Sequence, residues 1–235
     1  MQFGFKRRRS SGEQPRLRGR GETSAVRVEF TDLHPDTSTY LGQAAYLQLS
    51  VFEMLSTLSA AMDDLTFSPG VAEAATVALR KHTSLTDEIR RREEDPATAM
   101  AQPKDSVRRL REETDGGSIE QRVLSVYVTA GFLDDLFLGL ASSLPSDISK
   151  RVTAILAEDN RRDVLRQYLQ SRIQSTPEIS SMLALWGRRL VGDTLLLAHT
   201  IVPNENGANE ERVEPVFTEL IAAHTRRMDS LGLTA

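Results

Sequence analysis

The sequence predicts an all-α protein in which four long helices form a bundle, with additional C-terminal helices and a disordered basic N-terminal tail. From residue 38 onward, apolar residues recur at steps of three and four, the spacing of helices with one buried face. Only Val26, Val28 and Phe30 alternate with polar residues, and no second segment offers them a partner strand. We therefore expect these three residues to form an extended lead-in that packs against a helical body.

The composition bounds the size and the chemistry of the protein. At 235 residues and 40% hydrophobic content, the chain can bury a sizeable core, and we expect one helical domain over residues 25–235. The sequence contains no cysteine, which excludes disulfides, thiolate nucleophiles and zinc–thiolate sites. The lack of cysteine agrees with a reducing compartment, so we expect a cytoplasmic protein.

Residues 1–24 differ from the rest of the chain in charge. The first 22 residues carry seven basic and two acidic side chains, whereas the whole chain has a net charge of −4. The basic residues are Lys6, Arg7, Arg8, Arg9, Arg16, Arg18 and Arg20. One interpretation is an arm that contacts RNA phosphates; the other, which we favour because no aromatic residues lie among the arginines, is a solvated tail. No apolar run follows the basic cluster, so the pattern is not that of a secretory or twin-arginine signal.

Two long amphipathic helices are expected first along the chain, at about 38–62 and 69–94. Ser68 and Pro69 would open the second helix as its cap and first-turn residue. Gln48 lies on the apolar line of the first helix, and His82 on that of the second. The expected buried residues are Leu41, Ala44, Ala45, Phe52, Leu55 and Met62 in the first helix, and Val71, Ala75, Ala78, Leu85 and Ile89 in the second.

A long connection rich in Pro, Asp, Glu and Arg, residues 95–117, separates this pair from a third helix. The third helix has the most regular apolar line of the chain, formed by Ile119, Val123, Val126, Ala130, Leu133, Phe137 and Leu140. Residues 123–144 come nearest to a membrane span, but Asp134 and Asp135 lie in the middle, where each charge would cost about 2.5–3.5 kcal/mol in a bilayer. We therefore expect a helix of a soluble bundle and no membrane partner.

Three more helices are expected after Pro145. The first begins with Ser146 as its cap, and charged Glu158 and Arg162 interrupt its apolar line. Its expected buried residues are Ile148, Val152, Ile155, Leu165, Leu169 and Ile173. The last helix is expected at about 209–231.

The helix between these two, at 183–201, contains the only tryptophan. Its expected buried residues are Leu183, Trp186, Leu190, Leu197 and Ile201. Gly187 and Gly192 lie inside it, although an interior glycine costs a helix about 1 kcal/mol relative to alanine. We therefore expect close packing against a neighbouring backbone at both glycines.

Four long helices with a long connection between the second and third form a bundle with one crossover, which is the ferritin-like arrangement. The segments 183–193 (LALWGRRLVGD) and 222–232 (AAHTRRMDSLG) resemble ferritin-like proteins related to tRNA isopentenyladenosine hydroxylases. The resemblance covers roughly residues 38–232. It implies a di-iron centre in the bundle core, in which two helices each give one carboxylate and two each give a Glu-x-x-His pair.

The ligand positions that this resemblance implies do not carry the expected residues. Where the family has carboxylates on the first and third helices, this sequence has Gln48 and Ala130. The Glu-x-x-His pair of the second helix corresponds to Leu79 and His82, and that of the fourth to Glu158 and Arg161. Two of the six positions, His82 and Glu158, therefore keep a metal ligand, and they lie on different helices.

A check that does not depend on alignment uses the four histidines. The residues three places before them are Thr31, Leu79, Leu196 and Ile221, so the sequence contains no acid-x-x-His pair. A rearranged single-metal site would use His82 with Glu53, Asp87 or Asp134. The alternative is that His82 is an interior histidine bonded to a neighbour, and that the Asp134–Asp135 pair is a flank facing water or an arginine.

Arg161 suggests a different use of the former ligand positions. We expect it to pair with Glu158, one turn earlier, with Gln48 and His82 close by, so that a polar network fills the pocket. The alternative is that Arg161 and Arg162 bend outward to solvent.

Two functions of different classes follow. The preferred one is a non-catalytic ferritin-like bundle that binds another protein or a second copy of itself and needs no cofactor. The alternative is a di-iron or single-metal oxidoreductase that resembles tRNA hydroxylases, with the basic tail on RNA. The sequence has no phosphate-binding glycine loop, Gly-x-Ser-x-Gly or His-Glu-x-x-His motif to indicate other chemistry.

Overall fold

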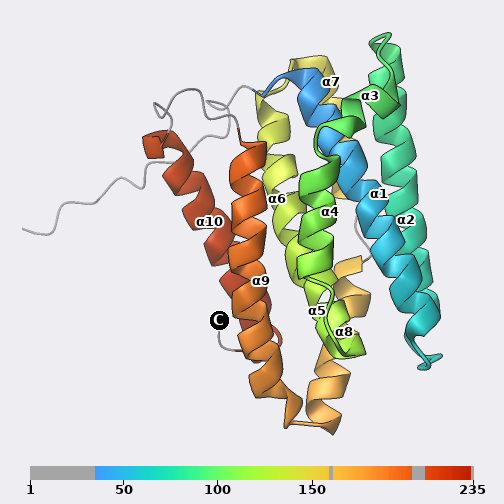
Figure 1. The fold of residues 1–235 in the computed structure, drawn as a ribbon, viewed down its shortest axis with the longest axis vertical. Helices are drawn as coiled ribbons and strands as arrows, with labels where there is room; N and C mark the ends of the chain where they lie inside the picture. Colours follow the sequence, from blue (N-terminus) through green and yellow to red (C-terminus); the bar gives the residue numbers. More distant parts are fainter. Residues whose placement is uncertain (1–34, 159–160, 203–209, 234–235) are drawn as a thin grey trace, which may run out of the picture.

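The computed structural model describes residues 35–158, 161–202 and 210–233, and every regular element in these ranges is a helix (Figure 1). The helices lie roughly side by side in an elongated bundle, which confirms the predicted all-α fold class. The N-terminal tail, with its seven basic residues, and the lead-in around Val26 lie outside the described residues.

The first two helices, α1 (Thr37–Ala61) and α2 (Ser68–Arg91), are the two long helices that the sequence predicts, and they lie antiparallel. The side chain of Asp36 caps α1 by accepting a hydrogen bond of 2.8 Å from the backbone amide of Thr39. The predicted apolar faces are buried, except that Phe52 is half-buried. Ser68 is not the cap: it is the first residue of α2, and its hydroxyl donates instead to the carbonyl of Ser59 on α1.

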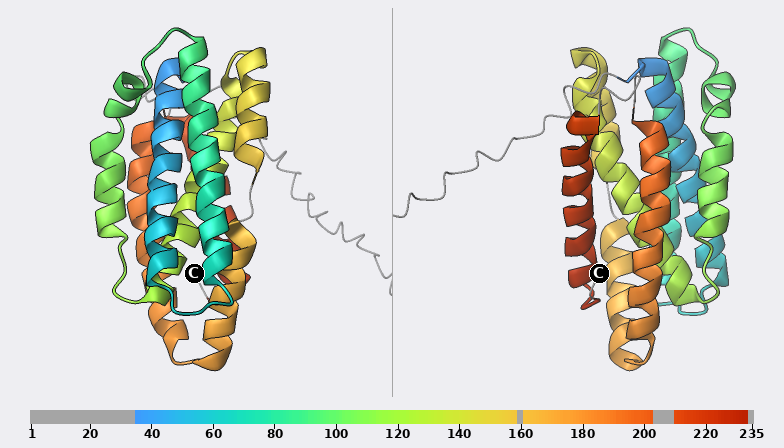
Figure 2. Two further views of the ribbon diagram at one scale, coloured as in Figure 1. Left: turned by 90° about the vertical axis from the view of Figure 1, so that its right-hand side faces the viewer. Right: turned by 60° about the vertical axis from the view of Figure 1, so that its left-hand side comes forward.

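The connection after α2 contains two short helices, α3 (Pro96–Ala101) and α4 (Lys104–Glu113). They run along the outside of α1, and α4 also packs against the C-terminal part of the chain (Figure 2). The approach of α3 is close: a Cβ on Gly42 of α1 would lie 2.2 Å from the carbonyl oxygen of Ala99. Because Gly42 has no side chain, α3 can pack closely against α1 at this point.

A continuous helical rod forms the centre of the bundle. It consists of α5 (Ile119–Ser125), the π-helical turn η2 (Val126–Ala130), α6 (Gly131–Leu140) and the 3₁₀ turn η3 (Ala141–Ser143). In the described part of the chain, this rod is the one segment long and apolar enough to cross a membrane, but 83% of its most apolar stretch is buried inside the protein. Such burial is typical of a core helix in a bundle. The predicted helix is therefore present, with a π turn that its periodicity did not indicate.

The predicted fourth helix is divided in two. The first part, α7 (Ser146–Ala157), ends where Glu158 adopts an extended backbone, and α8 begins at Arg161 and continues to Ser175. The division coincides with the charged interruption in the apolar line, so the prediction of one uninterrupted helix is wrong. Ser146 is the first residue of α7 and makes no capping hydrogen bond, which corrects its predicted role.

The last two helices, α9 (Ile179–Ile201) and α10 (Glu210–Asp229), lie next to each other on one side of the bundle (Figure 2). The predicted buried face of α9 is confirmed, although Trp186 is only half-buried. A Cβ on Gly187 would lie 2.2 Å from the Cε atom of Met228 on α10, so this glycine is closely packed, against a side chain rather than a backbone. Gly192 has nothing within 4 Å of a Cβ, so the expectation of close packing is wrong there.

Candidate functional site

Asp134, on α6, is the centre of a buried polar network that joins three helices. The amide of Gln48, on α1, donates a hydrogen bond of 2.9 Å to Oδ1 of Asp134. The guanidinium of Arg161, in the first turn of α8, donates to Oδ2. All three side chains are buried, which makes this the most enclosed ion pair between described residues.

A second cation lies near this carboxylate. Burial alone would raise the pKa of Asp134, but the charges of Arg161 and then Lys81 outweigh it, and the pKa lies below its ordinary value. Lys81, on α2, is buried, and its ammonium group donates a hydrogen bond of 2.9 Å to the carbonyl of Leu156. Asp134 is therefore a carboxylate that two cations of the same chain stabilise.

Tyr40 adds a neutral hydroxyl near the network. Its phenol donates a hydrogen bond of 2.7 Å to the carbonyl of Phe137, and the two rings meet edge to face with centroids 5.4 Å apart. Burial, and then the negative charge of Asp134, raise the pKa of Tyr40 above its ordinary value. The phenol consequently stays protonated and serves as a fixed donor.

The structure brings together two of the implied ligand positions, Gln48 and Arg161, through Asp134. It does not pair Arg161 with Glu158: Glu158 is half-exposed on the surface, where it pairs with Arg80 of α2. That prediction is wrong because the two residues do not share a helix, so the assumption that they lie one turn apart does not apply. The alternative that Arg161 points to solvent is also wrong, since its side chain is 5% exposed.

No hydrogen bond between described residues joins the remaining implied positions to Asp134. His82 is half-buried, and its Nδ1 is 2.9 Å from the carbonyl oxygen of Ala45, which fits the interpretation of an interior histidine. Leu79 is 38% exposed on α2. Ala130 is buried at the end of the π turn.

These residues do not fit a metal centre. Each acid that the single-metal hypothesis joins to His82 forms an ion pair with an arginine instead, Glu53 with Arg111, Asp87 with Arg90, and Asp134 with Arg161. Among the described residues, no three His, Cys, Asp or Glu side chains gather closely enough to hold a metal ion. The donor set that di-iron and single-metal sites require is thus not assembled in this part of the chain.

Comparison with known proteins agrees with the crossover bundle. A family model that describes the ferritin-like domain of actinomycetes matches residues 36–210, which span α1 to α9 and reach the first residue of α10. The protein belongs to this ferritin-like family. A search of curated proteins finds no match to the chain.

Lys81 is a member of this ferritin-like core that the helical spacing alone does not identify. It lies three residues after Ala78 and four before Leu85, so it satisfies the same helical spacing as His82. The spacing predicts that His82 faces the core, but in the structure Lys81 is buried more deeply than His82. A lysine at a core-facing position of an amphipathic helix indicates a buried polar contact, and this pattern could have identified Lys81.

A second ion cluster connects α6 of the ferritin-like bundle to α8 and α10. The carboxylate of Asp135 accepts hydrogen bonds from Arg162 and Arg227, and Arg227 also donates to the carbonyl of Gly131, at 3.0 Å. The expected flank facing water or an arginine is therefore right about the arginine for both Asp134 and Asp135, but Asp134 is buried in the core. Nearby on α10, His224 is 2% exposed and has no hydrogen-bond partner among the described residues. Burial, and then the charge of Arg227, lower the pKa of His224 to about 4.

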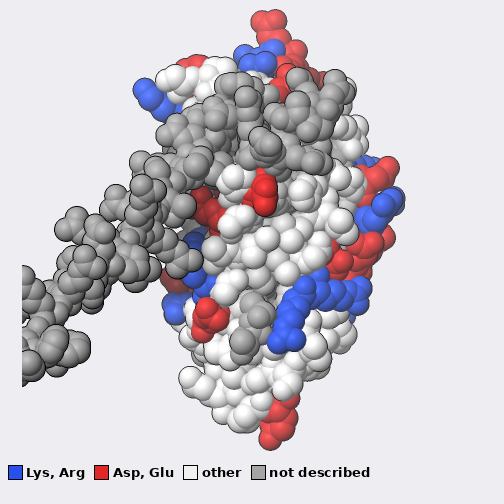
Figure 3. Space-filling model, turned by 90° about the vertical axis from the view of Figure 1, so that its left-hand side faces the viewer, with Lys and Arg blue, Asp and Glu red and all other residues white. Residues whose placement is uncertain are grey.

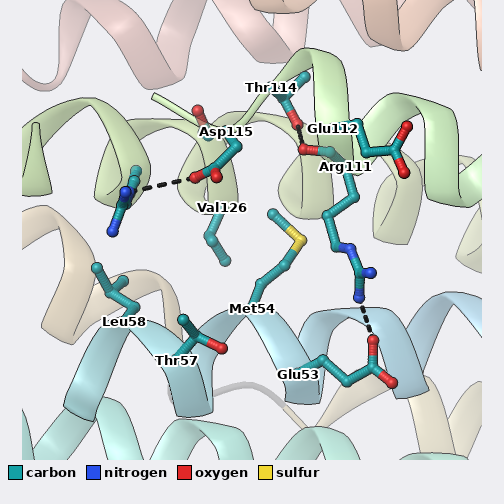
Figure 4. A pocket seen from close by; sticks show the side chains of 11 residues that line it. Glu53, Met54, Thr57, Leu58, Arg111, Glu112, Thr114, Asp115 and Val126 are labelled. Carbon is teal, nitrogen blue, oxygen red and sulfur yellow. Dashed lines mark hydrogen bonds and ion pairs between the residues drawn. The ribbon is translucent and has the colours of Figure 1, made fainter. Parts of the chain in front are cut away.

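A cleft of about 440 Å³ lies between α1 and the segment that joins α4 to the central rod (Figure 4). Met54 projects from α1 into its middle, and Leu58 and Val126 complete an apolar floor. On its sides, Glu53 pairs with Arg111 and Asp115 with Arg122. Glu112 also lines the cleft of this ferritin-like protein, so its charged side chains are three carboxylates and two guanidinium groups.

Proposed function

We propose that this ferritin-like protein is non-catalytic and acts by binding other macromolecules, and that a network of its own side chains replaces the di-iron centre of the tRNA hydroxylases that it resembles. The observation that supports this proposal is the pairing of Asp134 with Arg161, with Lys81 as a second nearby cation. We further propose that the protein works in the cytoplasm.

The physical argument is one of charge. A di-iron centre holds two metal cations between several carboxylates, whereas here one carboxylate lies near two organic cations. A metal ion placed next to Asp134 would be repelled by Arg161 and Lys81. Releasing Asp134 to a metal would also break its buried ion pair with Arg161, which costs several kcal/mol.

Metal analysis tests the proposal directly. The full-length protein is purified from iron-supplemented cells, and its iron content is measured by elemental mass spectrometry together with its absorption spectrum. We expect far less than one iron per chain and no absorption band of a di-iron centre. About two irons per chain with such a band would refute the proposal in favour of the oxidoreductase.

The variant Asp134→Asn provides the matched control. It keeps the shape of the side chain and removes the charge that a metal would need. We expect the same low iron content in the variant and in the unaltered protein, because the iron measured in either would be adventitious. Iron that is bound by the unaltered protein and lost from the variant would show that Asp134 is a metal ligand.

A further inference from the structure

The outer face of α9 carries two of the most exposed leucines in the described part of the chain. Leu185 is 64% exposed and Leu196 is 70% exposed. Figure 3 looks onto the side of the molecule that α9 and α10 form, and a broad area without Lys, Arg, Asp or Glu lies in its middle. Between the two leucines lie Arg189, which is half-exposed, and Gly192, above which there is open space.

These four residues, Leu185, Arg189, Gly192 and Leu196, form a stripe that we call the α9 seam. They are separated by four, three and four residues, so they lie on one face of the helix. The spacing is the same when it is read in the opposite direction. An antiparallel copy of α9 would therefore present its seam in the same register. Leu185 of one copy would lie opposite Leu196 of the other.

We infer that the protein forms a two-fold symmetric dimer in which the α9 seams of two copies pack antiparallel. Leu185 of each copy contacts Leu196 of the other, at both ends of the interface. Arg189 of each copy crosses over Gly192 of the other, where the missing Cβ leaves room for the arginine side chain. Such an isologous contact closes on itself and gives a dimer rather than a filament.

The charges of the seam fit a second copy better than an unrelated partner. Within one chain, Nε of Arg189 is 3.5 Å from Oδ2 of Asp193, which is a loose ion pair. The same guanidinium lies 5.1 Å from the centre of the Trp186 ring and donates a hydrogen bond of 3.4 Å to the carbonyl of Glu113. In the dimer, each Arg189 also lies beside Asp193 of the other copy, so that two arginines and two aspartates alternate in the centre. The other strongly exposed leucine, Leu65, lies in the turn between α1 and α2 and is not part of this stripe.

This inference rests on the proposed function, since it names the partner of a binding protein, and one set of samples tests the two separately. Mass is measured by light scattering or sedimentation over a range of concentrations, and iron is measured in the same preparations. We expect twice the chain mass of 26.1 kDa with little iron. A monomer at all concentrations overturns the dimer whatever its iron content, and two irons per chain refute the proposed function whatever the mass.

The variant Leu185→Glu tests the surface. Because the substitution occurs twice in a symmetric dimer, we expect it to weaken association by about 1,000-fold. The control is Leu65→Glu, which makes the same chemical change at a leucine that is 82% exposed elsewhere. Equal association of both variants would overturn the assignment of the α9 seam, and unchanged helix content shows that each variant folds.

Disulfide trapping tests the antiparallel register, because the natural chain has no cysteine. We expect a mixture of Leu185→Cys and Leu196→Cys chains to form a crosslinked dimer of one chain of each kind. Each variant alone should not crosslink, since identical positions would be about 16 Å apart along the helix axis and a disulfide needs Cα atoms within about 7 Å. Crosslinking of Leu185→Cys with itself would instead indicate a parallel pair and overturn this register.

Discussion

The carboxylate of Asp134 on α6 is paired with the guanidinium of Arg161, 27 residues later on α8, and both side chains are more than nine-tenths buried. Removing Arg161 takes away the cation that contacts the buried Asp134 directly, and removing Asp134 takes away a counter-ion of the buried Arg161. We expect Asp134→Leu or Arg161→Leu to lower the free energy of unfolding by about 3–5 kcal/mol each. The double variant should lose much less than the sum, as chemical denaturation would measure.

The exposed pair of Arg80 and Glu158 is the control for this prediction. Both side chains are about half-exposed, so water screens their attraction. Removing either should change the free energy of unfolding by less than about 1 kcal/mol. Strictly additive effects of the Asp134 and Arg161 substitutions would contradict the coupling that the structure indicates.

The buried His224 should make stability depend on pH. Its pKa in the folded protein is about 4, against an ordinary value of 6.5, so the folded state binds fewer protons than the unfolded state between these two values. The stability that the neutral imidazole provides is present above pH 6.5 and is lost as the pH falls toward 4, by at most about 1.4 kcal/mol per pH unit. Thermal unfolding across this range, with His224→Leu for comparison, would measure it. A variant with an unchanged pH dependence would contradict the prediction.

Two glycines with opposite surroundings give a matched pair of substitutions. A Cβ on Gly42 would collide with the backbone of Ala99 in α3, so we expect Gly42→Ala to destabilise the protein by about 1–3 kcal/mol. Gly192 has open space around it, and Gly192→Ala should stabilise the isolated chain by up to about 1 kcal/mol through helix propensity. Denaturation at low protein concentration tests both. A stabilising effect of Gly42→Ala would show that α3 does not pack as described.

The only tryptophan reports on the contact between α9 and the central rod. Nε1 of Trp186 donates a hydrogen bond of 2.9 Å to the hydroxyl of Ser125. We expect Ser125→Ala to cost about 1 kcal/mol and to change the tryptophan fluorescence of the folded protein. Ser142→Ala is the control, because Ser142 is exposed and its hydroxyl donates to the carbonyl of Gly139 in the same turn. This variant should leave the free energy of unfolding and the tryptophan fluorescence nearly unchanged. An unaltered emission spectrum for Ser125→Ala would count against the hydrogen bond.

The sequence was sufficient to predict the helices and their buried faces, because a helix with one apolar stripe has a clear period. The π turn was not predictable in this way. All residues from 123 to 134 are buried, so the central rod is covered on every side and a change of phase leaves no mark in the pattern. The end of α7 did leave a mark, since Glu158 and Arg162 interrupt the apolar line there. Helical spacing resumes beyond them, and it therefore indicated one helix where the structure has two.

The candidate site was predictable in three of its members, but not in Lys81 and not in its pairing. Gln48 and Arg161 were identified from the resemblance, and Asp134 from its position in an apolar helix. The partner of Arg161 was assigned to Glu158 because the two are close in sequence, whereas the actual partner comes from another helix. Pairing between distant elements depends on how the helices pack, and spacing along one helix carries no information about it.

The π turn at Val126–Ala130 accommodates one more residue than a regular helix would in the same length. Deleting one residue there would leave a regular α-helix of the same length, still able to occupy the centre of the bundle. The residues after the deletion would keep their direction, and Asp134 would still face Arg161. The turn therefore absorbs one residue locally, without changing which charged groups meet inside this protein.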